Sequence, residues 1–151
     1  PEKIITGLQK LGPEPFSSDF SLEYLAQKLS KSKRCIKILL LDQGLVAGIG
    51  NIYADEALFK SGIGPEAIAA DLNLEQIERL HRAIIEVLQV AIERGGTTLR
   101  DFLSVTGVNG NYGGVAWVYG RAGESCRACG TTIERLKLAG RSAHFCPRCQ
   151  S

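Results

Sequence analysis

Residues 126–149 read CRACGTTIERLKLAGRSAHFCPRC and hold two CxxC pairs separated by sixteen residues. This spacing is typical of a tetrahedral zinc site, in which each CxxC offers two thiolates to one ion. Two disulfides are the alternative, but they suit secreted proteins and would leave the odd Cys35 without a partner. We therefore predict one Zn²⁺ per chain. Its predicted ligands are Cys126, Cys129, Cys146 and Cys149.

The residues between the two pairs favour a β-hairpin. The stretches TTIERLKL (131–138) and SAHFC (142–146) can form strands, joined at Ala139, Gly140 and Arg141. So short a ribbon has little core of its own, so the metal is expected to supply much of its folding energy. Arg141 is then expected at the turn, where its side chain can reach outward.

Upstream of the hairpin, the sequence is mainly helical. The stretch from 74 to 92 places apolar residues at steps of three and four, the pattern of a long amphipathic helix. Asn73 and Gln76 form a capping box before it, and Gly95 ends it. His81 lies beside the apolar stripe and is interpreted as a packed helix residue. Shorter helices are predicted in SLEYLAQKL (21–29) and RCIKILLLD (34–42).

A glycine-containing loop precedes another predicted helix, in LVAGIGNIYADEALF (45–59). Gly48 and Gly50 let the backbone approach a ligand closely, and the N–H groups of a helix that starts at Asn51 suit a phosphate. Asn51 as a plain N-cap is the alternative. Lys33 and Lys37, just upstream, are expected to point to the same cleft.

Charge is sorted along the 151 residues, although the net charge is only +2. Residues 28–37 contain five bases and no acid, and from 117 onward six bases accompany two acids. Two solvated faces or polyanion binding can explain this pattern equally well. No apolar run approaches the roughly 18 residues of a membrane span, so we expect a soluble cytoplasmic protein.

Four stretches together carry a family resemblance. LVAGIGNIYADEALF, GGTTLRDFL, VYGRAGESCRACGTTI and AGRSAHFCPRC, in this order, closely resemble the C-terminal half of bacterial formamidopyrimidine-DNA glycosylase. Endonuclease VIII shares the architecture, but GNIYADE and TTLRDF are more similar to the formamidopyrimidine enzyme. The resemblance implies a mainly α fold: a helix-two-turns-helix domain over 1–115, with a lesion-capping loop near 104–116, followed by a zinc finger (zinc ribbon) over 116–151.

The resemblance also implies a function. The family is a bifunctional DNA glycosylase and AP lyase for oxidised purines (8-oxoguanine and formamidopyrimidines). The implied partner is double-stranded DNA with an oxidised purine or abasic site, bound by a monomer at the bacterial nucleoid. Asn51 resembles the family's phosphate-binding asparagine, Lys37 a lysine that supports that contact, and Lys33 is a further DNA-binding candidate. Arg141 resembles the finger arginine that binds phosphates and is credited with a catalytic proton-donor role. Because a guanidinium is a poor acid, we favour charge neutralisation.

The start of the sequence departs from the family pattern. In the family an N-terminal proline attacks the sugar, and this chain begins Pro1-Glu2, but KIITGLQKLG follows and leads directly into helices. We therefore expect Pro1 to mark a cut in a longer chain, so that this chain binds DNA and zinc but does not excise bases. A stand-alone zinc-ribbon module for RNA or a protein partner is the competing hypothesis, although such a module would not need the glycine loop.

Overall fold

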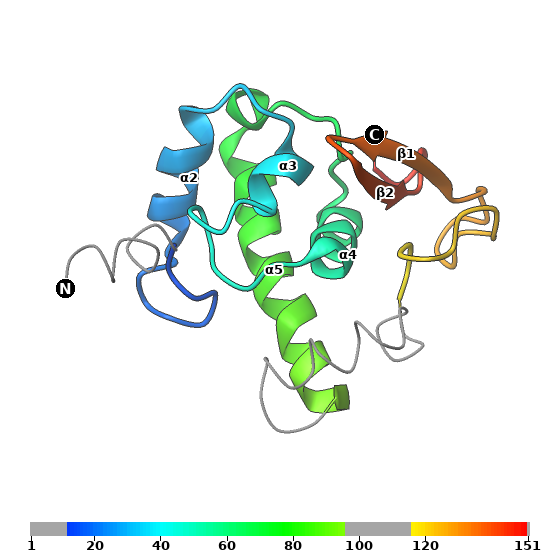
Figure 1. Cartoon of the computed structure of the whole chain (residues 1–151), viewed down its shortest axis with the longest axis horizontal. Helices are drawn as coiled ribbons and strands as arrows, with labels where there is room; N and C mark the ends of the chain where they lie inside the picture. The colour runs from blue at the N-terminus through cyan, green and yellow to red at the C-terminus, as the bar shows by residue number, and fades with distance from the viewer. Residues whose placement is uncertain (1–11, 96–115, 151) are drawn as a thin grey trace.

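The computed structural model describes residues 12–95 and 116–150 and is mainly helical, as predicted (Figure 1). Helices precede a two-stranded hairpin, which confirms the predicted fold class. The elements are α2 (Leu22–Ser30), α3 (Ile36–Leu40), α4 (Asn51–Ser61), the 3-10 helix η1 (Ala69–Asp71), α5 (Leu74–Gly95), β1 (Glu134–Leu138) and β2 (Arg141–Phe145). Pro1, the stretch TTLRDF and the predicted loop near 104–116, except its last residue, lie outside the described residues. No helix in the described ranges is long and apolar enough to cross a membrane.

Helix α5 is the central element of the helical part, and α2, α3 and α4 lie around it (Figure 1). Leu80, Ile84 and Leu88 bury one face of α5 at helical spacing. The predicted capping box is present: Asn73 and Gln76 exchange side-chain-to-backbone hydrogen bonds of 2.8 Å in both directions. These bonds satisfy N–H groups that the first helical turn cannot pair, so they fix where α5 begins.

Helices α2 and α4 begin where the sequence predicts, whereas α3 is shorter than the predicted 34–42 and spans only Ile36–Leu40. The Ser21 hydroxyl caps α2, and α4 starts at Asn51, although Gly50 and not Asn51 is its N-cap. His81 stacks on the ring of Phe20 at 4.9 Å between centroids, and its Nε2 lies 2.7 Å from the Phe20 carbonyl oxygen. His81 is therefore a packed helix residue, as predicted.

Strands β1 and β2 pair antiparallel, with a register that runs from Glu134 opposite Phe145 to Leu138 opposite Arg141. Ala139 and Gly140 alone form the turn, with φ values of 51° and 83°. Two successive residues with positive φ are typical of a tight hairpin turn whose twist matches the strands. The prediction that Arg141 lies in the turn is therefore wrong. Arg141 is the first residue of β2, and it is exposed.

Candidate functional site

Helix α4 begins with an open N-terminus. No side chain caps its first N–H groups, and its first turn contains no acidic residue. A Cβ added at Gly50 would meet nothing within 4 Å, so a ligand has room to approach the backbone there. The Gln43 side chain holds the preceding loop, because it accepts the Gly48 N–H at 2.8 Å and donates to the Ile49 carbonyl at 3.2 Å. The absence of a capping side chain and the helix dipole make this end suitable for an anion.

The carbonyl of Ser142 connects the hairpin to this helix end. It accepts hydrogen bonds from Asn51 Nδ2 and from Lys37 Nζ, each 3.0 Å long. The Oδ1 atom of Asn51 is buried and has no hydrogen-bond partner. Because Ser142 directly follows Arg141, these bonds place the exposed arginine beside the N-terminus of α4. Three of the predicted site residues, Asn51, Lys37 and Arg141, therefore lie together.

Lys37 is fully buried and does not reach solvent. Its ammonium group pairs with the Asp55 carboxylate on α4. Burial lowers the pKa of Lys37, and the nearby charge of Arg141 lowers it further, while Asp55 opposes both effects. The expectation that Lys33 and Lys37 point to the same cleft is not met. Lys33 is exposed, and among the described residues no hydrogen bond or ion pair joins it to Asn51, Lys37 or Arg141.

Sequence reasoning missed Asp55, a buried acid of α4. Its Oδ2 accepts the backbone N–H of His144 at 3.1 Å and lies 2.9 Å from His144 Nδ1, while its Oδ1 accepts from Lys37. The ring of His144 in turn meets that of Tyr119 edge to face at 4.9 Å. One available signal was a pair of adjacent acids within the apolar stretch IYADEALF, because buried acids require partners.

Glu56, the neighbouring acid, was also missed. Its carboxylate accepts the backbone N–H groups of Trp117, Val118 and Tyr119 at 2.7, 2.9 and 3.0 Å. Burial raises the pKa of Glu56, although these three hydrogen bonds oppose the shift. Glu56 thus anchors the segment that leads into the finger, and with Asp55 it fixes the finger on α4 by polar contacts.

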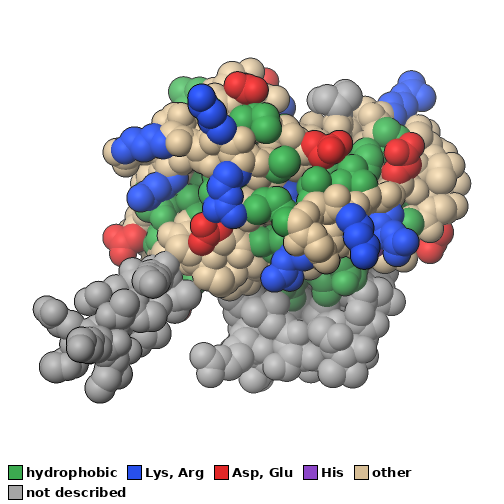
Figure 2. All heavy atoms as spheres, turned by 45° about the horizontal axis from the view of Figure 1, so that its top comes forward, with side chains coloured by type: hydrophobic (Ala, Val, Ile, Leu, Met, Phe, Trp, Pro, Cys, Tyr) green, Lys and Arg blue, Asp and Glu red, His purple; other side chains and the backbone are tan. Residues whose placement is uncertain are grey.

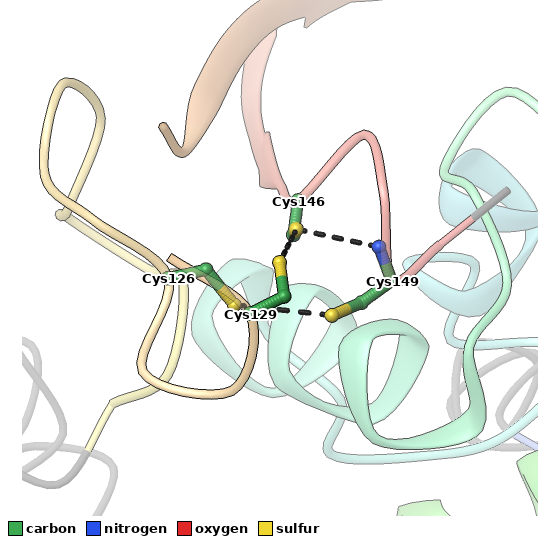
Figure 3. Close-up of side chains that lie close together, drawn as sticks. All are labelled: Cys126, Cys129, Cys146 and Cys149. Atoms are coloured by element: carbon green, nitrogen blue, oxygen red, sulfur yellow. Dashed lines mark hydrogen bonds between the residues drawn. The ribbon is translucent and has the colours of Figure 1, made fainter. Parts of the chain in front are cut away.

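The four predicted zinc ligands form one cluster (Figure 3). Their sulfur atoms all lie within 4.8 Å of one another, with 3.9 Å between Cys126 and Cys149 and 3.4 Å between Cys129 and Cys146. Ligands about 2.3 Å from a tetrahedral zinc are themselves about 3.8 Å apart, so the cluster fits one such ion. No disulfide joins any of the five cysteines in this structure, which agrees with a shared metal site in preference to two disulfides.

Backbone groups support the cluster. The N–H of Ala128 donates to Cys126 Sγ at 3.4 Å, and the N–H of Cys149 donates to Cys146 Sγ at 3.3 Å. Gly130 has a φ of 80° and donates its N–H to the Cys126 carbonyl at 2.8 Å, so the backbone turns beneath the first pair. Donors directed at sulfur stabilise thiolates, the form that zinc binds.

Charge on the surface is mixed rather than segregated. In the view of Figure 2, Lys and Arg side chains lie over both the helical part and the finger, with Asp and Glu side chains among them. The basic segments of the sequence therefore do not merge into one continuous positive area on this face. Anion binding here depends on the local arrangement at α4 and β2 more than on the field of a broad patch.

Two family models match the chain. The formamidopyrimidine-DNA glycosylase H2TH domain matches residues 11–103, and the zinc finger found in FPG and IleRS matches residues 123–151. The first match covers the helices and the second covers the cysteine cluster. Both parts of the predicted architecture are therefore confirmed.

Curated relatives extend this similarity over the whole chain. The formamidopyrimidine-DNA glycosylase of Rippkaea orientalis is 69% identical over 151 residues, which are 100% of this chain and 54% of the relative. That of Crocosphaera subtropica is 66% identical over 150 residues, 99% of this chain and 53% of the relative. The chain thus spans about half the length of the curated relatives it matches.

Solved structures agree in fold. Lactococcus lactis Fpg, non-covalently bound to DNA containing an AP site, matches with a TM-score of 0.83 and 43% identity over 99% of this chain and 54% of that chain. MutM (Fpg) from Thermus thermophilus gives a TM-score of 0.83 and 44% identity over 99% of this chain and 57% of that chain. The predicted resemblance to the C-terminal half is confirmed, and the chain belongs to the formamidopyrimidine-DNA glycosylase family.

Proposed function

We propose that this chain binds the sugar-phosphate backbone of double-stranded DNA beside an abasic site or oxidised purine. One observation carries the proposal: Asn51, at the uncapped N-terminus of α4, donates a hydrogen bond to the Ser142 carbonyl near the start of β2. Asn51 uses one amide hydrogen there and retains a second for a phosphate oxygen. The related Lactococcus lactis structure, which contains abasic-site DNA, supports this choice of ligand.

Each site residue receives a role. Asn51 and the N–H groups of α4 bind one phosphate, and Arg141 neutralises a neighbouring one through charge-assisted hydrogen bonds. Lys37 supports both from beneath with a buried positive charge, and exposed Lys33 contributes to DNA attraction at longer range. The four clustered cysteines hold one zinc ion, which stabilises the hairpin and supplies no reaction chemistry.

We assign the chemistry to the whole family protein, a bifunctional DNA glycosylase and AP lyase that acts on oxidised purines. Lys37 is unsuited as a nucleophile because its amine is buried against Asp55. We expect this chain alone to bind damaged DNA without excising a base, with Arg141 assisting strand cleavage by neutralising charge. The proposed units are a DNA-binding domain over 1–115, with the lesion-capping loop near 104–116, and a finger over 116–151. The protein is proposed to act as a monomer on the chromosome in the bacterial cytoplasm.

Binding to a duplex with a tetrahydrofuran abasic-site analogue tests the proposal. Asn51→Ala and Arg141→Ala should each lower the affinity on the order of tenfold at low salt, since each removes a hydrogen bond to a charged group. Arg135→Ala, which removes the same charge from an exposed position on β1, is the matched control and should change affinity little. Unchanged affinity in both Asn51→Ala and Arg141→Ala would refute DNA binding at this site.

The stand-alone zinc-ribbon hypothesis makes a different prediction. A module that binds through its ribbon alone should lose affinity with Arg141→Ala but not with Asn51→Ala. Borohydride trapping on abasic DNA tests the assignment of chemistry separately. We expect no covalent adduct with this chain, and an adduct would contradict that assignment while leaving the binding site intact.

A further inference from the structure

Strand β2 has one edge without a partner strand. The described sheet has two strands, and pairing of Leu138 with Arg141 and Leu136 with Ala143 directs the backbone groups of those β2 residues toward β1. By strand alternation, the backbone groups of Ser142 and His144 point to the opposite edge. Such groups need partners when they are buried.

The helical part supplies these partners through side chains. The His144 N–H donates to Asp55 Oδ2 at 3.1 Å, and the Ser142 carbonyl accepts from Lys37 Nζ and Asn51 Nδ2, each at 3.0 Å. Asp55 also accepts from Lys37, so one carboxylate acts on both positions of the strand, directly at 144 and through the lysine at 142.

The Asp55 carboxylate is buried and both of its oxygens have partners. It is 1% exposed in the middle of α4, and its two oxygens are used by residues of α3 and β2. Without this carboxylate, the ammonium of Lys37 would be buried with no counter-ion, a costly arrangement that is relieved by movement of the lysine or the strand, or by loss of the lysine's proton. Either movement changes the position of Ser142, and therefore of Arg141 beside it.

We propose that Asp55 is a positioning residue that holds Arg141 at the DNA-binding site from within the protein, by fixing the free edge of β2 through Lys37 and His144. This inference rests on the proposed function. A long arginine side chain has many rotamers, and a fixed backbone origin reduces what must be ordered when DNA binds. Asp55 acts without touching DNA.

The test combines Asp55→Asn with Arg141→Ala in a double-mutant cycle on the duplex with the tetrahydrofuran analogue. Asp55→Asn should retain one zinc per chain but bind about as weakly as Arg141→Ala, on the order of tenfold below wild type. The slope of log affinity against log salt should become shallower by about 0.9, as expected when one phosphate contact is lost. The double variant should bind no more weakly than either single variant.

Glu75→Gln is the control, because it removes the same charge from an exposed ion pair with Arg79 on α5, 2.7 Å long. It should keep the wild-type affinity and salt slope. Losses from Asp55→Asn and Arg141→Ala that add, or an unchanged slope in Asp55→Asn, would overturn the positioning role. If Arg141→Ala and Asn51→Ala both bind normally, the proposed function itself fails.

A second variant keeps the test decisive if Asp55→Asn does not fold. His144→Phe removes the ring contact with Asp55 but leaves the Lys37 ion pair and the His144 N–H bond in place. It should weaken binding by about threefold, less than Asp55→Asn, and add nothing to Arg141→Ala. Wild-type affinity, or a loss that adds to that of Arg141→Ala, would overturn the proposal.

Discussion

The helical part and the finger are stabilised in different ways. The helical part buries a large apolar cluster, in which Leu25, Leu29, Leu80 and Leu88 are fully enclosed. The cluster buried in the described part of the finger consists of Val118, Cys126, Ile133 and Cys146, so half of it is predicted zinc ligands. Hydrophobic burial can stabilise the helical part by itself. The finger depends on the metal and on contacts with two acids of α4.

Zinc removal is the strongest test of this difference. Chelation, or Cys126→Ser, should unfold residues 116–150 and leave residues 12–95 folded, because zinc contributes about 10–16 kcal/mol in isolated fingers. Metal analysis and amide NMR dispersion for each region check this. Zinc content well below one per chain after purification without chelator would contradict the assignment of the four ligands.

Leu80→Ala should weaken the helical part and leave the zinc site of the finger intact. The fully buried side chain leaves a cavity in the helical core, so the free energy of unfolding should fall by about 2–5 kcal/mol while zinc content is retained. Leu74→Ala is the control, since Leu74 is 65% exposed at the start of the same helix, and it should cost less than about 0.5 kcal/mol. Urea denaturation measures both; equal losses would contradict the proposed role of the core.

Glu56→Gln tests the connection between the regions. A carboxamide offers one acceptor oxygen where two now serve three N–H groups, so stability should fall by about 1–3 kcal/mol. Hydrogen exchange should quicken at Trp117, Val118 and Tyr119 while the zinc site stays occupied. Exchange unchanged at these three amides would show that Glu56 does not anchor the segment.

The smallest effect concerns the pH response of Lys37, whose pKa is lowered mainly by burial. Its ammonium contributes to DNA affinity below the folded-state pKa, and this contribution falls as the pH rises through that value. Stability has the opposite sign: the unfolded chain holds the proton more tightly, so the free energy of unfolding rises with pH between the folded and unfolded pKa values.

Comparison of wild type with Lys37→Met over about pH 7 to 10 checks both trends. The difference in DNA affinity between wild type and Lys37→Met should fall from roughly tenfold or less toward none as the pH rises. The midpoint of this change should lie below the ordinary pKa range of lysine. A constant difference across this range would mean that Lys37 does not act through its charge.

Much of the fold could be predicted because its signals are local. The periodicity and the Asn73–Gln76 box define α5, and the spacing of the cysteines indicates the metal cluster. The position of Arg141 was missed because the turn contains Ala139 with a positive φ. A residue with a Cβ rarely adopts this conformation, so the sequence does not predict a two-residue turn at this position.

The candidate site was harder to predict because its contacts are distant in sequence. Lysines are rarely buried, so the burial of Lys37 becomes intelligible only with Asp55, 18 positions away, and Ser142, 105 positions away. Glu56 accepts hydrogen bonds from backbone N–H groups more than 60 residues later. Because nearly every residue type has a backbone N–H, the sequence does not show which residues will donate. The glycine loop and the predicted hairpin drew attention to Asn51 and Arg141, but their specific DNA-binding roles were assigned from a family resemblance, not from periodicity.

Helix α4 carries a consequence for how this sequence can change. Its buried residues include apolar side chains that face the helical core and acids that face the finger, while its first turn stays open to a ligand. Helix α5, by contrast, has a solvent-facing side on which polar residues can be exchanged. In a saturation scan of all positions, α4 should be the segment least tolerant of substitution. Side chains on most of its faces already contact either the helical core or the finger.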